Sequence, residues 1–213
     1  MNDEKQNNDS GMLLRAAMSA IPALAPLAAW WSEFNSTKNA KRLQVLIDTL
    51  NALVACHSRE LDAINKDTSK FEERIAILEV TLDKVVKEWQ QDKIKKHAQL
   101  LIQNLISNDP IQLKMSILER FSELTLEDLN ILEPLSISSS VQVKEFHISL
   151  DELIPILSKL ESRGLITQTG HGNRGIWTMA SSDNWREQWL NRFYTATPFG
   201  RKLWNSINSI KQE

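Results

Sequence analysis

The sequence predicts a mainly α-helical protein in which a long antiparallel helical hairpin precedes a second module that contains a small β-hairpin. Three observations lead to this prediction. Apolar residues recur every three or four positions through residues 36–109, shorter capped segments follow in residues 110–213, and a glycine-rich stretch at residues 170–175 lies between two β-prone runs. The chain has 213 residues, a length that suits two small domains. We therefore expect a domain boundary between residues 109 and 110.

The composition is that of an ordinary globular protein. Hydrophobic residues make up 42% of the chain and charged residues 24%, with a net charge of −2, which excludes collagen-like, disordered and polytopic membrane proteins. The single cysteine, Cys56, excludes an internal disulfide framework and fits a reducing cytosol. The six glycines include no phosphate-binding run, which argues against a nucleotide-binding enzyme. Seven tryptophans beside one tyrosine are the unusual feature of the composition.

The first 35 residues divide into a polar and an apolar part. Residues 1–10 have nothing to bury, so we expect a disordered tail. Residues 11–35 begin with an apolar run of about 20 residues, the length of a membrane span. Arg15, Pro22 and Pro26 make full insertion unfavourable. Two interpretations stay open, because the segment either packs on protein or lies in a membrane interface. The predicted contact residues are Leu13, Leu14, Ile21, Leu24, Trp30, Trp31, Lys38, Lys41 and Arg42.

Residues 36–109 carry the most regular apolar pattern. One stripe runs from Leu43 to Ile64 and a second from Phe71 to Trp89, with a polar break between them. An average spacing of about 3.5 residues keeps one seam facing a partner helix, and the short break predicts a hairpin. We assign Trp89 to the buried seam, although the register slips by one residue after it. The charged residues nearby are expected on a solvated outer face, with a lysine-lined contact to an acidic partner as the alternative. They are Lys84, Lys87, Glu88, Lys93, Lys95 and Lys96.

The elements predicted from residue 110 onwards are short and begin with four helical or ambiguous pieces. A helix from Pro110 through Glu123 precedes one that Thr125 caps and Pro134 stops. Residues 141–148 are ambiguous between a strand and a helix. Ser149 and Glu152 predict a capping box at the start of the next helix. That helix is expected to end at Arg163, before Gly164.

The remaining C-terminal elements are β-rich and end in a helix. Residues 165–169 and 176–179 predict a β-hairpin around the glycine-rich turn, and residues 193–195 a third strand. A tryptophan-bearing helix or turn is expected at residues 184–192. Thr197 and Pro198 then start the last helix.

This order of helices, hairpin and closing helix predicts a winged helix-turn-helix domain in residues 110–213. Many such domains insert the third helix into the DNA major groove. The candidate nucleic-acid contacts are Lys159, Arg163, His171, Asn173 and Arg174. The third helix also carries Asp151, Glu152 and Glu161, and it has no asparagine or glutamine to address base edges. DNA binding is therefore disfavoured, and a protein-contact or packing role is expected.

The sequence predicts no catalytic residue, no metal site and no cofactor. The four histidines are far apart and no cysteine pair exists. Cys56 and His57 are neighbours, but a helix points neighbouring side chains about 100° apart, which excludes a dyad. We expect Cys56 to be a packing residue and His57 to be buried. The C-terminal tryptophans are assigned to a small core, with a stacking surface for single-stranded nucleic acid as the alternative. They are Trp177, Trp185, Trp189 and Trp204.

Several segments resemble known bacterial families. Residues 157–169 (LSKLESRGLITQT) and 194–207 (YTATPFGRKLWNSI) are similar to the segments before and after the wing in bacterial winged-helix proteins, with Ala196 in place of the usual leucine. Residues 13–43 and 98–135 resemble bacterial abortive-infection alpha-like proteins, many of which are found beside phage-resistance genes. The usual glycines after Pro22 are absent here. The resemblance implies a role in bacterial defence and no particular reaction.

These observations together predict a non-enzymatic anti-phage defence protein that acts through protein–protein contacts. We expect a protein partner or a homo-oligomer. The expected location is the cytoplasm, with the apolar segment placing the protein at the periphery of the inner membrane in one interpretation. Two alternatives stay open: a kleisin-like scaffold subunit of an ATPase complex, and a winged-helix DNA-binding regulator.

Overall fold

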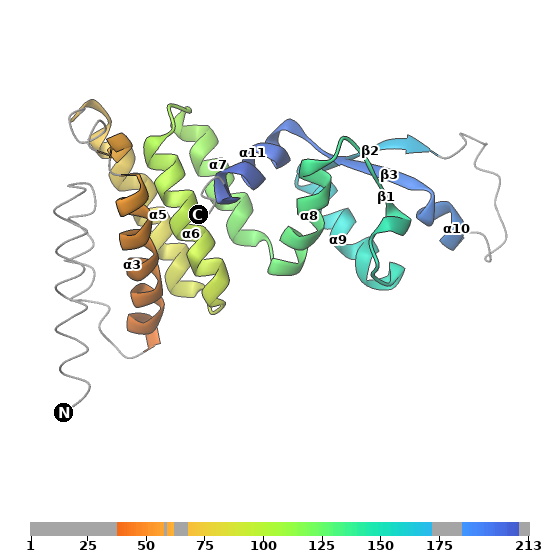
Figure 1. The fold of residues 1–213 in the computed structure, drawn as a ribbon, viewed down its shortest axis with the longest axis horizontal. Coiled ribbons are helices and arrows are strands. Elements are labelled where there is room, and N and C mark those ends of the chain that lie inside the picture. The colour runs from red at the N-terminus through yellow and green to blue at the C-terminus, as the bar shows by residue number, and fades with distance from the viewer. Residues whose placement is uncertain (1–37, 58, 62–67, 172–184, 209–213) are drawn as a thin grey trace. The chain divides into compact units, whose positions relative to one another are not determined.

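The structure, a computed structural model, describes residues 38–57, 59–61, 68–171 and 185–208. The described part is mainly helical and contains a small three-stranded antiparallel sheet (Figure 1). Two compact units divide the chain: Met1–Ser122 with Ser206–Glu213, and Glu123–Asn205. Each unit has a core of its own. The predicted mainly α-helical class is thus confirmed.

The first unit is helical. It contains α3 (Lys38–Cys56), the 3₁₀ turn η2 (Thr68–Lys70), α5 (Phe71–Lys87), α6 (Gln91–Ile106) and α7 (Ile111–Glu123), whose last residue falls in the second unit. Helix α3 packs against both α5 and α6. The apolar stripes predicted from the sequence supply much of the core, because side chains three and four residues apart share one helix face. Buried members of these stripes include Leu43, Ile47, Leu50, Leu78, Leu82, Val85, Ile94, Ala98 and Leu101. Leu46 and Ile77, which lie outside the stripes, are buried as well, whereas the stripe residue Phe71 at the start of α5 is 44% exposed.

The assignment of Trp89 to the buried seam is wrong. Helix α5 ends at Lys87, and the Glu88 carboxylate accepts hydrogen bonds from the backbone N–H groups of Trp89 and Gln90 (2.9 and 3.0 Å). A side chain that holds two backbone donors stabilises a turn there, and α6 begins only at Gln91. The slip in register marks this helix boundary. Residues 36–109 therefore hold α3, α5 and α6 in their described part rather than two continuous helices.

The second unit combines helices with the sheet. Its elements are α8 (Leu126–Ile137), β1 (Val141–Gln142), the 3₁₀ turn η3 (Val143–Glu145), α9 (Leu150–Ser162), β2 (Ile166–His171), α10 (Trp185–Leu190) and β3 (Arg192–Ala196). Helix α11 (Pro198–Asn208) follows. The ambiguous residues 141–148 thus form both a short strand and a helical turn. The buried core includes Leu129, Leu132, Leu135, Leu153, Leu157, Leu160, Ile166, Tyr194 and Leu203.

Strand β3 lies at the centre of the sheet. The order is β1-β3-β2, with Val141 opposite Tyr194 and Ile166 opposite Ala196, and both pairings are antiparallel. The strand predicted near residue 194 is therefore the partner of β2. The strand predicted at residues 176–179 lies outside the described residues.

The helix ends show which of the predicted capping and stop residues start or end a helix in the structure. Thr125 and Asp128 form the predicted capping box of α8, each side chain accepting from the other's backbone N–H group (3.2 and 2.7 Å). Gly164 has a φ of +69° just after α9, as a left-handed helix end requires. The prediction that Pro134 stops α8 is wrong, since the helix continues to Ile137. Proline removes one backbone donor, and burial of the following Leu135 outweighs that loss.

The start of α11 packs against the turn that follows α9. The Thr197 backbone N–H donates to the Leu165 carbonyl oxygen (2.9 Å), and the Thr197 hydroxyl donates to the Gly164 carbonyl oxygen (2.7 Å). A Cβ atom on Gly200 would lie 2.0 Å from the Leu165 oxygen, so only glycine fits there. The two sequence segments that resemble winged-helix proteins therefore meet at a close backbone approach.

Candidate functional site

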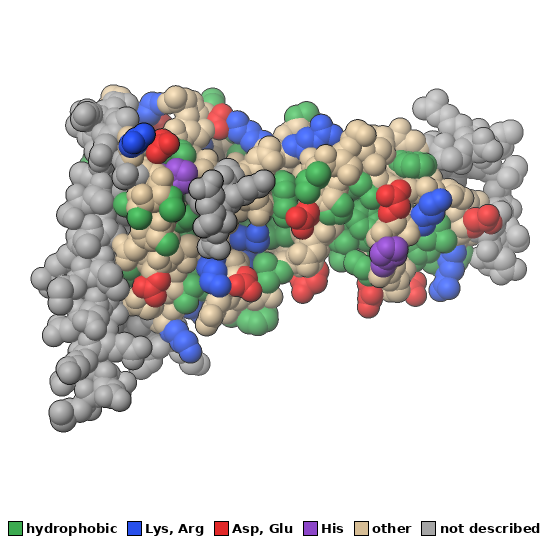
Figure 2. Space-filling model, viewed as in Figure 1, with side chains coloured by type: hydrophobic (Ala, Val, Ile, Leu, Met, Phe, Trp, Pro, Cys, Tyr) green, Lys and Arg blue, Asp and Glu red, His purple; other side chains and the backbone are tan. Residues whose placement is uncertain are grey.

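Helix α9 presents an acidic surface. Its apolar side chains Leu153, Leu157 and Leu160 are buried and fix which face points to solvent. The exposed residues of α9 are Asp151, Glu152, Pro155, Ser158, Glu161 and Ser162. No lysine or arginine of this helix is in the exposed class. Figure 2 shows acidic side chains over the region of α8 and α9. We call the surface formed by these exposed α9 residues the α9 face.

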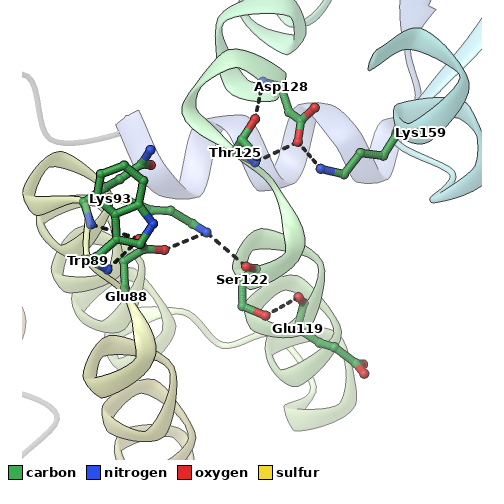
Figure 3. A network of polar contacts seen from close by, with 9 residues as sticks. Glu88, Trp89, Lys93, Glu119, Ser122, Thr125, Asp128 and Lys159 are labelled. Atoms are coloured by element: carbon green, nitrogen blue, oxygen red, sulfur yellow. Dashed lines mark hydrogen bonds and ion pairs between the residues drawn. The ribbon is translucent and has the colours of Figure 1, made fainter. Parts of the chain in front are cut away.

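Lys159, one of the predicted nucleic-acid contacts, forms an ion pair within the second unit. Its Nζ contacts Oδ2 of Asp128, whose side chain is only 3% exposed (Figure 3). The same Oδ2 accepts the Thr125 backbone N–H at 2.7 Å. Because the carboxylate is buried and already belongs to the α8 cap, the lysine completes its hydrogen bonding. The Lys159 charge is thus directed towards α8.

Arg163, the predicted contact that directly follows α9, is also paired. Its Nη1 contacts Oε2 of Glu123, and the arginine side chain is 27% exposed. The Nε atom is buried without a hydrogen-bond partner. His171 ends β2, where its backbone pairs with Arg192. Asn173 and Arg174 lie outside the described residues. The predicted cations of α9 therefore serve the unit's own packing.

A group of aromatic and basic side chains lies on and beside α10. The Arg192 guanidinium carbon is 3.7 Å from the centroid of the Trp189 ring, and that of Arg186 is 5.4 Å from the Trp185 ring. Trp185 is 40% exposed, so its assignment to a small core is wrong. Arg186 also lies 3.7 Å from Asp151 in a solvent-exposed ion pair, a contact type that contributes little to stability. Each of these rings already has an arginine of the same unit as its cation partner.

Three of the predicted membrane or subunit contacts lie in the described residues. Lys38 begins α3, Lys41 is exposed, and Nη1 of Arg42 donates to the Val86 carbonyl oxygen at the end of α5. Leu13, Leu14, Ile21, Leu24, Trp30 and Trp31 lie outside them. None of the helices that the structure describes has the length and apolar character needed to cross a membrane.

A buried ion pair supports the turn between α5 and α6, so the placement of Glu88 and Lys93 on a solvated outer face is wrong. Lys93 Nζ lies 2.8 Å from Oε2 of Glu88, with side chains 8% and 10% exposed, and donates to the Ser122 carbonyl oxygen at 3.0 Å (Figure 3). Burial alone would raise the pKa of Glu88. The hydrogen bond and charge of Lys93, together with the N–H groups of Gln90 and Trp89, outweigh burial and lower that pKa. Glu88 is therefore a firmly ionised carboxylate that holds the turn.

His97 is the most buried histidine of the described residues. It is 1% exposed, and its ring meets Phe121 edge to face at 4.6 Å between centroids. Burial and, secondly, the charge of Lys93 lower the pKa of His97 from 6.5 to about 3. Its Nδ1 is buried without a hydrogen-bond partner. A general base needs a pKa near the working pH and access to substrate, so the environment of His97 suits a neutral core residue.

Potential metal ligands do not gather into a site in the described part of the chain. No group of three or more His, Cys, Asp and Glu side chains there is placed to hold a metal ion. Cys56 is exposed, so its assignment as a packing residue is wrong. The Nδ1 atom of His57 lies 3.9 Å from Oε2 of Glu60, and its Nε2 is buried without a partner.

Comparisons of the chain with protein-family models, curated proteins and solved structures found no match. Two features of the candidate surfaces had little or no signal in the sequence. The exposure of Trp89 was signalled only by the register slip beside it. The pairing of Lys159 with Asp128 had no sequence signal, because the partners are 31 residues apart and meet only after folding.

Proposed function

We propose that this protein is a non-enzymatic adaptor whose second unit is a winged-helix module that contacts protein rather than DNA. Two features support the winged-helix assignment. The elements follow the order α8, β1, η3, α9, β2, α10, β3, and β3 lies between β1 and β2 in an antiparallel sheet. In this arrangement α9 has the position of the helix that reads DNA in DNA-binding members of the class.

The composition of the α9 face carries the proposal. It bears carboxylates at Asp151, Glu152 and Glu161, while Lys159 and Arg163 are engaged in ion pairs. DNA affinity rests largely on cations that neutralise phosphates, and an acidic helix placed in the groove would be repelled. A basic surface on a partner protein would be attracted to the α9 face, because complementary charges speed association and orient the two proteins.

The biological setting proposed is bacterial anti-phage defence. It rests on the resemblance of residues 13–43 and 98–135 to abortive-infection alpha-like proteins. Membrane association through residues 11–35, and a protein partner or second subunit for that segment, belong to the same proposal. A kleisin-like scaffold role would also use a protein-contacting winged helix, so a co-purifying ATPase is the observation that would favour it.

The first experiment tests the α9 face against DNA. Fluorescence anisotropy measures binding of the full chain to a labelled duplex between about 50 and 200 mM salt, a range in which phosphate contacts lose much of their affinity. We expect no binding by the natural protein. A variant with Asp151→Lys, Glu152→Lys and Glu161→Lys should gain salt-sensitive binding. The matched control places Glu127→Lys and Glu133→Lys on exposed positions of α8. Salt-sensitive duplex binding by the natural protein would replace the proposal with a DNA-binding regulator.

The second experiment tests the adaptor role in cells. Phage plaque counts are compared in bacteria that express the natural chain and a neutral variant, Asp151→Asn with Glu152→Gln and Glu161→Gln. We expect the natural chain to lower the plaque count and the neutral variant to lose that effect, at unchanged protein abundance. The α8 control should protect as well as the natural chain. Protection that survives neutralisation of the α9 face would refute its role in partner contact, and no protection by the natural chain would refute the defence setting.

A further inference from the structure

One end of the first unit displays an indole on a rigid turn. Trp89 is 74% exposed, the highest value among the exposed large hydrophobic side chains of the described residues. The Glu88 carboxylate holds the backbone N–H groups of Trp89 and Gln90, and Lys93 holds that carboxylate at 2.8 Å. The backbone that carries the indole is therefore already ordered before a partner binds. Binding then costs little conformational entropy, which favours affinity.

The charges around Trp89 are mainly basic. From residue 83 to residue 96 the chain has five lysines and three acidic residues, a net charge of +2. Glu88 and Lys93 form the buried pair and cancel. Lys87 and Lys95 pair with Asp83 and Asp92 at 2.7 and 3.0 Å in exposed contacts, and such contacts exchange easily with other anions.

The start of α3 lies at this same end. Arg42 donates to the Val86 carbonyl oxygen, which places the first turns of α3 beside the last turn of α5. The beginning of α3 is at the lower end of the first unit in Figure 1. Lys41 on that turn is exposed. We call the exposed residues Lys41, Lys87, Trp89 and Lys95 the Trp89 end.

The segment that precedes Lys38 joins the described structure at the Trp89 end. Thirty-seven residues precede Lys38, and the apolar run 11–31 finishes with Trp30 and Trp31. Seven residue steps separate Trp31 from Lys38, so their Cα atoms are at most about 25 Å apart. Any surface that takes up the apolar run is therefore within reach of the Trp89 end.

We propose that the Trp89 end docks on the surface of an anionic phospholipid membrane. The indole would lie at the level of the headgroups, and the lysines would face lipid phosphates. Protein interface cores are depleted in lysine, whereas tryptophan and lysine together are favoured at the interface of an anionic bilayer. This inference concerns the first unit alone and does not depend on the α9 face.

The test measures co-sedimentation of the full chain with vesicles. One set contains equal amounts of phosphatidylcholine and phosphatidylglycerol, and the other contains phosphatidylcholine only. The natural protein should bind the anionic vesicles and lose binding at high salt. Trp89→Ala should weaken the partition about tenfold or more, and Lys87→Gln and Lys95→Gln about fivefold each. The matched control is Trp185→Ala, an exposed tryptophan of the second unit, which should bind as the natural protein does.

Each other outcome overturns the inference. Absence of binding to both vesicle types does so directly. Equal binding by the natural protein and Trp89→Ala would assign the contact to the apolar segment alone. To keep this comparison clear, the Trp89 effect is also measured in a variant with Trp30→Ser and Trp31→Ser, where it should persist. Light scattering without vesicles that finds a dimer dissolved by Trp89→Ala would make a second copy the occupant instead.

Discussion

The buried histidine of α6 makes the stability of the protein dependent on pH in a way that can be measured. His97 is 1% exposed and packs on Phe121. Burial is the main cause that lowers its pKa from 6.5 to about 3, the charges of Lys93 and Lys84 add to it, and Glu88 opposes it. Between pH 6.5 and about pH 3, His97 carries a proton in the unfolded chain but not in the folded protein. Stability is therefore highest above the unfolded pKa and falls as the pH falls towards 3.

The size of the effect follows from the same two values. At pH 5 the solution is about 1.5 units below the unfolded pKa, and each unit corresponds to about 1.36 kcal/mol, so His97 costs about 2 kcal/mol of unfolding free energy between pH 7 and pH 5. In the folded protein the pKa of His97 is about 3, well below pH 5. His97 therefore stays unprotonated in the folded protein between pH 7 and pH 5, and nothing offsets the loss of unfolding free energy.

Urea denaturation at pH 7, 6 and 5 measures the effect. The natural protein is compared with His97→Gln, which cannot take up the proton, and with His147→Gln, a control at an exposed histidine. The natural protein and the control should lose about 2 kcal/mol more than His97→Gln between pH 7 and pH 5. If all three proteins lose the same free energy over this range, then His97 does not stay neutral in the folded core and the reasoning is refuted.

Three further predictions concern stability and use the same denaturation assay. Gly200→Ala should cost about 2 kcal/mol or more because its Cβ would overlap a carbonyl oxygen, while Gly170→Ala, whose Cβ finds its nearest atom at 3.7 Å, should cost far less; similar losses would contradict the close approach. Thr125→Ala should cost about 1 kcal/mol by removing the cap of α8, and an unchanged midpoint would show that the cap is dispensable. Lys93→Met should cost about 3 kcal/mol because it leaves Glu88 buried without its partner, and adding Glu88→Gln should recover part of the loss, whereas additive losses would argue against the pair.

Local signals in the sequence were reliable where the cause of the structure is itself local. Thr125 caps α8 and Gly164 ends the turn after α9, because a cap and a left-handed residue involve only neighbouring backbone groups. Pro134 shows the limit of such signals. Its effect on the backbone is local, but the continuation of α8 depends on the burial of Leu135 in a core built from distant residues.

The candidate surfaces depended on contacts that no single stretch of sequence contains. Lys159 and Arg163 are ordinary cations in the sequence, and their counterions, Asp128 and Glu123, are 31 and 40 residues away. The acidic excess of α9 was visible beforehand from its composition. The sequence did not show that Lys159 and Arg163 form ion pairs with other residues of the second unit. Because these two cations are paired, the exposed surface of α9 is acidic.

By itself the sequence determined the helical class, the capped start of α8, the glycine turn after α9 and most buried positions of the stripes in α3, α5 and α6, because periodicity and capping act over a few residues. Only the tertiary structure decided which charged and aromatic side chains remain at the surface. Trp89 illustrates this division. Its spacing matches a buried seam, yet Glu88 binds the backbone beside it and Lys93 holds that carboxylate, so the helix stops and the indole turns out to solvent. Whether a side chain is exposed depends on how the helices pack together. The spacing of residues along α5 cannot show that Lys93 of α6 binds Glu88 and helps to end the helix there.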